Sequence, residues 1–175
     1  WELELLPMYM LISIWGSGRK EYSAMKFLMF TILGSAFMLV AILAVFVTPE
    51  VGTFNMRELV ENGIDGSRVI IPISAIFWLF VVAFAIKLPI WPVHTWLPDA
   101  HTDAPTAVSI MLAGVLLKMG GYALIRISVG MFSDLGDVET FGWILAVLAV
   151  ISVLYGAAVT LRQTDLKRLI AYSSV

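Results

Sequence analysis

Two stretches of this chain, residues 27–47 and 141–161, contain no charged side chain. Each matches the roughly 20 mainly apolar residues that a helix needs to cross the hydrocarbon core of a bilayer. Backbone groups in lipid must be hydrogen-bonded internally, so a long apolar run of this kind folds as a transmembrane helix. We therefore expect an all-α, multi-pass integral membrane protein whose solvent is the lipid bilayer.

Four further apolar runs predict additional or partial spans: residues 3–15, 69–86, 106–125 and 169–175. The first and the last of these are short, and they lie at the two ends of the sequence. We interpret residues 1–175 as a single transmembrane domain that forms an internal part of a longer polytopic protein. About five spans and the start of a sixth are expected within it.

Composition excludes several classes of protein. Hydrophobic residues make up 60% of the chain, and charged residues make up only 14%, against about 25% in ordinary soluble domains. The net charge of −2 and the lack of a basic stripe exclude a nucleic-acid partner. Because there is no cysteine, Cys-ligated zinc, iron–sulfur clusters and thiol catalysis are excluded as well. No nucleotide-binding motif is present, so we expect no cofactor in this chain.

Alternate connections between the spans differ in positive charge. The connections expected on one side are residues 16–22, 99–105 and 162–168. Together with Lys26, this side holds six Lys and Arg residues, against three on the other side. Loops rich in Lys and Arg remain cytoplasmic, so we predict that these three connections face the cytoplasm. The loop at residues 48–68, with a short surface helix at 54–60, is expected on the opposite side.

One apolar stretch is too long for a straight span. From residue 69 to residue 100 it would measure roughly 48 Å as a helix, while the hydrocarbon core is about 30 Å thick. Pro89, Pro92 and Pro98 lack the backbone N–H of a helix interior. The carbonyls that lose their helical partners belong to Ala85, Leu88 and His94. We therefore expect a broken helix, which is the usual framework for an ion site in transporters.

Two lysines are the strongest candidates for function. Lys87 ends an apolar run immediately before the predicted break, and Lys118 lies about 20 Å into its helix when measured from Pro105. Charged side chains inside a membrane are costly and by default suggest a functional site. A lysine whose acidic partner comes and goes is a switchable proton site. The alternatives are a lysine that snorkels to the surface at Lys87 and one that is only hydrogen-bonded to nearby carbonyls at Lys118.

Acidic and histidine side chains supply possible partners. Glu2 and Glu4 are two residues apart, so they cannot share one helix face, and one of them is expected to pair with a lysine. His94, His101 and Asp99 flank the break, where they are candidates for a proton relay or for hydrogen bonding to the freed backbone. Their spacing matches no recognised metal motif, so we expect no metal site.

The chain resembles a known family of ion-translocating membrane proteins. Residues 83–101 read AFAIKLPIWPVHTWLPDAH and resemble the central signature of the proton-antiporter-like subunits of respiratory complex I and the Mrp-type cation/proton antiporters. Residues 104–126, APTAVSIMLAGVLLKMGGYALIR, resemble the next helix of that family. Residues 1–16 and 165–175, WELELLPMYMLISIWG and DLKRLIAYSSV, are similar to the M-type branch of NADH:quinone oxidoreductase, also called chain 4.

The resemblance implies a larger antiporter-like bundle of two inverted repeats, of which this chain would hold most of the first. It implies that Glu2 pairs with Lys87 and that Lys118 is the next proton-translocating lysine, while Glu4 is an additional acid. The chain would be a proton-translocating subunit of an NADH:quinone oxidoreductase, with other membrane subunits as its partners. NADH, FMN, iron–sulfur clusters and quinone would be bound by other subunits, and the chain itself would hold no redox centre.

The membrane implied is a bacterial cytoplasmic membrane, with the mitochondrial inner membrane or the thylakoid membrane as alternatives. Three other functions fit the same residues: an Mrp-type Na⁺/H⁺ antiporter subunit, a membrane-bound hydrogenase subunit and a purely structural membrane scaffold. Only the scaffold predicts that Lys87 and Lys118 can be neutralised without loss of pumping.

Overall fold

The computed structural model describes residues 1–47, 53–62, 71–132 and 138–175, and within these ranges every regular element is a helix. This confirms the all-α expectation. The elements are η1 (Glu2–Glu4), α1 (Leu5–Trp15), α2 (Lys20–Val47), α3 (Met56–Asn62), α4 (Ile73–Lys87), α5 (Trp96–Asp103), α6 (Thr106–Met111), η3 (Leu112–Leu116), α7 (Leu117–Ala123), η4 (Leu124–Val129), α8 (Val138–Leu161) and α9 (Leu166–Ser174).

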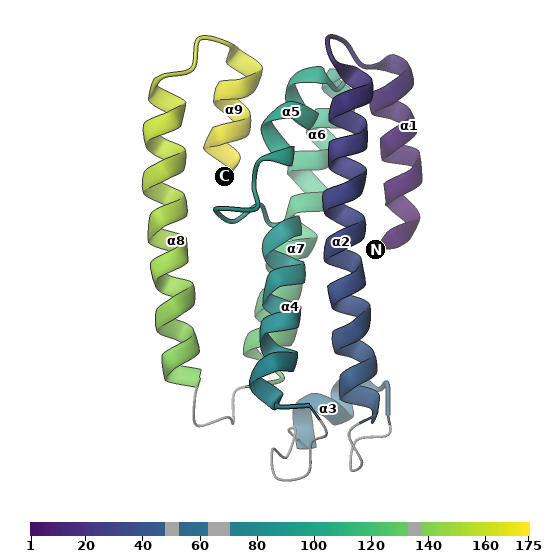
Figure 1. Ribbon diagram of the computed structural model, residues 1–175, viewed down its shortest axis with the longest axis vertical. Helices are drawn as coiled ribbons and strands as arrows, with labels where there is room; N and C mark the ends of the chain where they lie inside the picture. The colour runs from purple at the N-terminus through teal and green to yellow at the C-terminus, as the bar shows by residue number, and fades with distance from the viewer. Residues whose placement is uncertain (48–52, 63–70, 133–137) are drawn as a thin grey trace.

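Three helical stretches are long and apolar enough to cross a membrane: Lys20–Val47, Thr106–Val129 and Phe141–Leu161. They correspond to the predicted runs at residues 27–47, 106–125 and 141–161, while the run predicted at residues 69–86 forms the shorter apolar helix Ile73–Lys87. The second is one continuous stretch, formed by α6, η3, α7 and η4. The helices α1, α4, α5 and α9 are shorter, and α1 and α9 reach only part of the height of the bundle (Figure 1).

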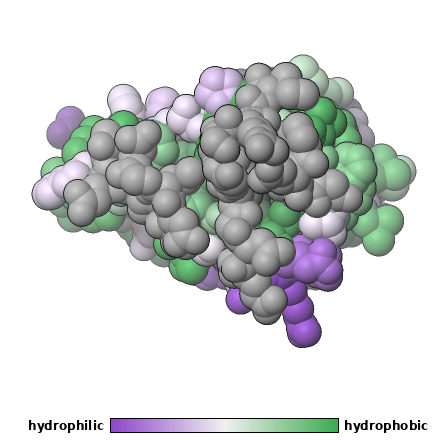
Figure 2. Space-filling view, turned by 90° about the horizontal axis from the view of Figure 1, so that it is seen from below, coloured by the Kyte–Doolittle hydropathy of each residue, from purple (hydrophilic) through white to green (hydrophobic). Residues whose placement is uncertain are grey.

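The outer surface of the bundle is apolar. Side chains such as Trp143, Leu154 and Ile125 are 75%, 66% and 67% exposed. Seen from the α3 end, hydrophobic side chains reach the outer edge on both sides of the bundle (Figure 2). A water-soluble protein rarely exposes so much contiguous apolar surface, so this surface fits contact with lipid or with other membrane-embedded protein.

Three connections lie together at one end of the bundle (Figure 1). The N–H of Ser17, after α1, donates to the carbonyl of Asp103 at the end of α5, at 2.8 Å. Lys167, at the start of α9, donates to the carbonyl of Ala104 at 2.9 Å. The prediction that the first, third and fifth connections lie on one side is therefore confirmed. That this side faces the cytoplasm remains a prediction.

The opposite end carries α3, which matches the short surface helix predicted at residues 54–60. The rest of the predicted loop, residues 48–52 and 63–68, lies outside the described residues, as do residues 69 and 70 of the third apolar run.

The long apolar stretch is broken as predicted. Helix α4 ends at Lys87, the backbone turns irregularly, and α5 begins at Trp96. Because Pro89 has no N–H, the carbonyl of Ala85 instead accepts from Ile90, at 2.9 Å. This shift leaves the carbonyl of Ile86 available, and it accepts from the indole Nε1 of Trp96 at 2.9 Å.

Further backbone groups in and beside the break also have hydrogen-bond partners. The carbonyl of His94 accepts from the N–H of Leu97 at 3.0 Å. The N–H of Trp91 donates to the hydroxyl of Ser152, on α8, at 3.0 Å. Irregular backbone at membrane depth is tolerated only where protein covers it or where it lines a water-filled cavity, and here α8 supplies part of that cover.

Glycines allow the helices around the break to approach closely. A Cβ at Gly120, on α7, would lie 2.9 Å from the backbone nitrogen of Leu88 and 3.2 Å from the Cβ of Lys87. A Cβ at Gly34, on α2, would lie 3.3 Å from the carbonyl oxygen of Ala83 on α4. The end of α4 is thus held between α2 and α7, because small residues let helix backbones come together in a membrane.

We expect Gly120→Ala to destabilise the protein by about 1–3 kcal/mol, since its new methyl group would overlap the backbone at the end of α4. The matched control is Gly121→Ala, whose Cβ would meet only a side-chain methyl of Leu88 at 3.4 Å. Thermal unfolding of the two detergent-solubilised variants measures the difference. Equal stability of the two variants would contradict the close approach.

Candidate functional site

Lys87 is a buried charge at the middle of the bundle. It is the last residue of α4, it is 2% exposed, and its Nζ forms an ion pair with Oε1 of Glu4. The ammonium also stands over the ring of Trp1, 5.1 Å from its centroid. A buried charge is tolerated when it is paired and hydrogen-bonded, and an aromatic face adds further attraction for a cation. The snorkelling alternative for Lys87 therefore fails, because the side chain turns inward.

The acid that meets Lys87 is Glu4 and not Glu2, so the expected Glu2–Lys87 pair is wrong in this structure. Glu4 immediately precedes α1, and its side chain is 23% exposed. Glu2 is exposed, at the other end of the short turn η1. The two positions are two residues apart on a 3₁₀ turn, which separates their side chains by about 240°. Only one of them can face Lys87, as the sequence spacing requires.

Lys118 lies near Lys87 along the bundle but points elsewhere. It sits on α7, two residues before Gly120, whose backbone rests against Lys87 and Leu88. Two residues on a helix correspond to a rotation of about 200°, so Lys118 projects from the opposite side of α7. Its side chain is exposed on the surface of this chain.

The two histidines at the break are buried. His94 is 3% exposed and packs against Tyr155 of α8 and Tyr172 of α9, with ring centroids 5.0 and 6.4 Å away. His101, on α5, is 4% exposed. Nδ1 of His94 and Nε2 of His101 have no hydrogen-bond partner among the described residues. Both rings therefore keep a nitrogen that the surrounding helices leave unused.

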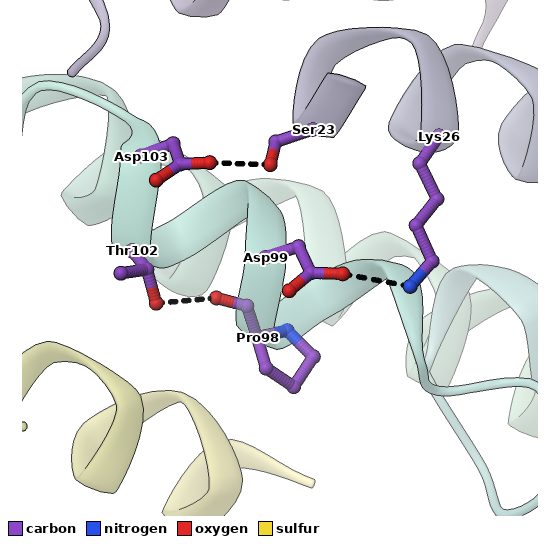
Figure 3. Close-up of polar contacts among 6 residues, drawn as sticks. All are labelled: Ser23, Lys26, Pro98, Asp99, Thr102 and Asp103. Atoms are coloured by element: carbon purple, nitrogen blue, oxygen red, sulfur yellow. Dashed lines mark hydrogen bonds and ion pairs between the residues drawn. The ribbon is translucent and has the colours of Figure 1, made fainter. Parts of the chain in front are cut away.

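Asp99 has a partner that the sequence analysis missed. It forms an ion pair with Lys26, at 2.7 Å between Oδ2 and Nζ, which joins α5 to α2 (Figure 3). One turn further along α5, Asp103 accepts from the hydroxyl of Ser23 at 2.5 Å. By sequence, Lys26 groups with the connection cations because it directly precedes the apolar run at residues 27–47. In the structure α2 begins at Lys20, so Lys26 lies inside the helix and faces α5.

Lysine, carboxylate and imidazole groups, which this site contains, are side chains that can exchange protons. Within the ranges that the structure describes, no three His, Cys, Asp or Glu side chains gather as they would around a metal ion. The site instead holds a buried lysine paired with an acid at the end of α4, while His94 lies in the irregular segment beyond it and His101 lies on α5. Groups of this kind mark proton relays and ion pathways in membrane proteins.

Comparisons with known proteins show which family the chain belongs to. The family model described as NADH:quinone oxidoreductase/Mrp antiporter, TM, matches residues 1–175. NAD(P)H-quinone oxidoreductase chain 4 1 of Synechococcus sp. (strain JA-2-3B'a(2-13)) is 46% identical over the whole chain. NAD(P)H-quinone oxidoreductase chain 4 of Gloeobacter violaceus is 45% identical over 99% of it. In both cases the chain spans 32% of the relative's length.

Two solved structures share the fold. Respiratory complex I from Thermus thermophilus with bound NADH matches 99% of this chain and 36% of its own chain, at 31% identity and a TM-score of 0.85. The membrane-bound sulfane sulfur reductase, an archaeal respiratory membrane complex, matches 99% of this chain and 35% of its own, at 27% identity and a TM-score of 0.87. Because the family model covers the whole chain, the chain belongs to the NADH:quinone oxidoreductase/Mrp antiporter family of membrane-spanning proteins.

Proposed function

We propose that this chain is part of a proton-translocating membrane subunit of an NAD(P)H:quinone oxidoreductase. The observation that carries the proposal is the ion pair between Lys87 and Glu4, buried at the end of a broken helix. A structural scaffold has no need of such a charge, because burying a charge in a membrane is expensive and an apolar residue would pack there at less cost.

The proposed mechanism begins with a change in this ion pair. While the acid is close, the charged form of Lys87 is stabilised by attraction. When the acid moves away, the ammonium is left in a low-dielectric environment where its charge is unfavourable. In this proposal the proton then leaves Lys87 through water that would enter at the irregular backbone of the break, where such backbone is tolerated beside water. The buried rings of His94 and His101, each with an unpartnered nitrogen, are candidates for its further transfer.

Lys118 is the proposed next proton acceptor after Lys87. It is close to the level of Lys87 but faces away from it, so a proton that reaches Lys118 has moved across α7. A charged side chain at the middle of a span faces protein or water in preference to lipid. We therefore propose that protein covers this face of α7 in the complete subunit and continues the proton path.

Redox energy for this transfer would come from elsewhere in the complex. NAD(P)H, flavin, iron–sulfur clusters and quinone are proposed to be bound by other subunits, while this chain holds none of them. Its partners would be other membrane subunits, and the membrane would be the bacterial cytoplasmic membrane, with the thylakoid as an alternative. The cyanobacterial origin of the similar quinone oxidoreductase chains supports a bacterial membrane.

A second candidate is a subunit of a different respiratory or antiporter complex. The sulfane sulfur reductase matches the fold with a TM-score of 0.87, as well as complex I does. Its sequence identity is only 27%, against 46% for a quinone oxidoreductase chain. The fold therefore does not separate the two candidates. We favour the quinone oxidoreductase because of the higher sequence identity.

Removing both acids of the N-terminal turn should remove the carboxylate that stabilises the charged form of Lys87. For Glu2→Gln combined with Glu4→Gln in the full-length subunit, we expect proton pumping to fall by about a hundredfold. Pumping is measured with a pH-gradient dye in membrane vesicles, and quinone reduction with an uncoupler present is measured alongside it. Each single variant then identifies which acid serves Lys87, the structure favouring Glu4.

The matched control for the acids is Glu21→Gln, at the exposed start of α2. It should pump normally, since it removes the same charge far from Lys87. A double variant of Glu2 and Glu4 that pumps like the parent protein would contradict a role for the acidic turn.

Lys118→Ala should also stop pumping while the complex still assembles, because the proton loses its next acceptor. We expect a fall of about a hundredfold in pumping, with a comparable loss of coupled turnover. The control is Arg126→Ala, which removes another exposed cation from the same helical stretch. Unchanged pumping by the Lys118 variant would reduce this lysine to a surface residue.

A further inference from the structure

A second ion pair lies at the break, between helices that are distant in the sequence. Lys26 on α2 contacts Asp99 on α5 at 2.7 Å, and their side chains are 21% and 19% exposed (Figure 3). Both charges are thus mostly removed from solvent. An isolated surface pair contributes little to stability, but a pair shielded to this degree leaves an unfavourable unpaired charge when one partner is removed.

The half-helix that carries Asp99 depends on contacts with its neighbours. Helix α5 has eight residues, which is too short to be stable by itself in water. It is held by the Lys26–Asp99 pair and, one turn later, by the hydrogen bond from Ser23 to Asp103 (Figure 3). Of these two contacts with α2, only the first joins opposite charges.

The same half-helix is connected to Lys87. Asp99 lies three residues after Trp96, whose indole donates to the carbonyl of Ile86 at 2.9 Å. Ile86 directly precedes Lys87. The ring of Trp96 also packs on Phe27, adjacent to Lys26, with centroids 5.5 Å apart. A shift of α5 away from α2 would therefore pull at the backbone that positions the buried lysine.

We propose that Lys26 and Asp99 are positioning residues for proton transfer at Lys87, an inference that rests on the proposed function. Their ion pair holds α5 against α2, so that Trp96 keeps the end of α4 and the ammonium of Lys87 in place. In this role the charge of Lys26 matters, but its proton does not move. Arginine, which keeps its charge and effectively never deprotonates, should therefore replace it.

The test compares Lys26→Met with Lys26→Arg in the full-length subunit within the assembled complex. Lys26→Met should lower proton pumping roughly tenfold to a hundredfold, the scale expected when a reacting group is misplaced. It should also raise amide hydrogen exchange across residues 88–104, since local opening becomes easier. Lys26→Arg should leave both quantities near the parent values, because the charge is retained.

Exchanging the two charges of the Lys26–Asp99 pair gives a second, independent test. Lys26→Asp combined with Asp99→Lys should recover part of the pumping and protection that either single change removes, since the attraction is rebuilt in reverse. Lys20→Met is the matched control, because Lys20 lies on the same helix and donates to the carbonyl of Ile14 at 2.9 Å, away from Asp99. It should change neither pumping nor exchange across residues 88–104.

The outcomes separate this inference from the proposed function. Normal pumping by Lys87→Met would overturn the proposed function. Loss of pumping by Lys87→Met, with normal pumping and exchange in Lys26→Met, would overturn only the positioning role. Loss of pumping in Lys26→Arg with unchanged exchange would also overturn it, because it would show that Lys26 must itself release a proton.

Discussion

The cost of burying one ammonium group governs much of this structure. Lys87 is almost completely removed from solvent, and a charge in that position needs a partner to be stable. The N-terminal turn supplies the acid and Trp1 supplies an aromatic face. The proposed function uses the same dependence, because movement of the acid would leave the ammonium without its partner.

The broken helix brings this charge to the middle of the bundle. Prolines end α4 at Lys87, and the freed backbone is then satisfied by the indole of Trp96 and the hydroxyl of Ser152. Glycine at position 120 lets α7 lie directly against the end of α4. Local backbone chemistry, close packing and the placement of the charge are therefore parts of one arrangement.

The sequence predicted those features that depend on local chemistry. Apolar runs predicted the spans, and Pro89 and Pro92 predicted the break. It did not predict that Glu4 contacts Lys87, because the two-residue spacing of Glu2 and Glu4 shows that only one of them can face the lysine and not which one. It also missed the Lys26–Asp99 pair, since a contact between residues 73 positions apart depends on how α2 packs against α5. The roles of Glu2, Lys87 and Lys118 in proton transfer remain predictions.

The most direct test of the account is the number of protons pumped per quinone reduced by the assembled complex that carries Lys87→Met. Methionine keeps the length and the apolar stem of lysine but removes the charge and the proton. The account predicts an assembled complex whose pumping ratio falls to near zero while uncoupled electron transfer persists. An assembled complex with an unchanged ratio would contradict the claim that this buried lysine carries the translocated proton.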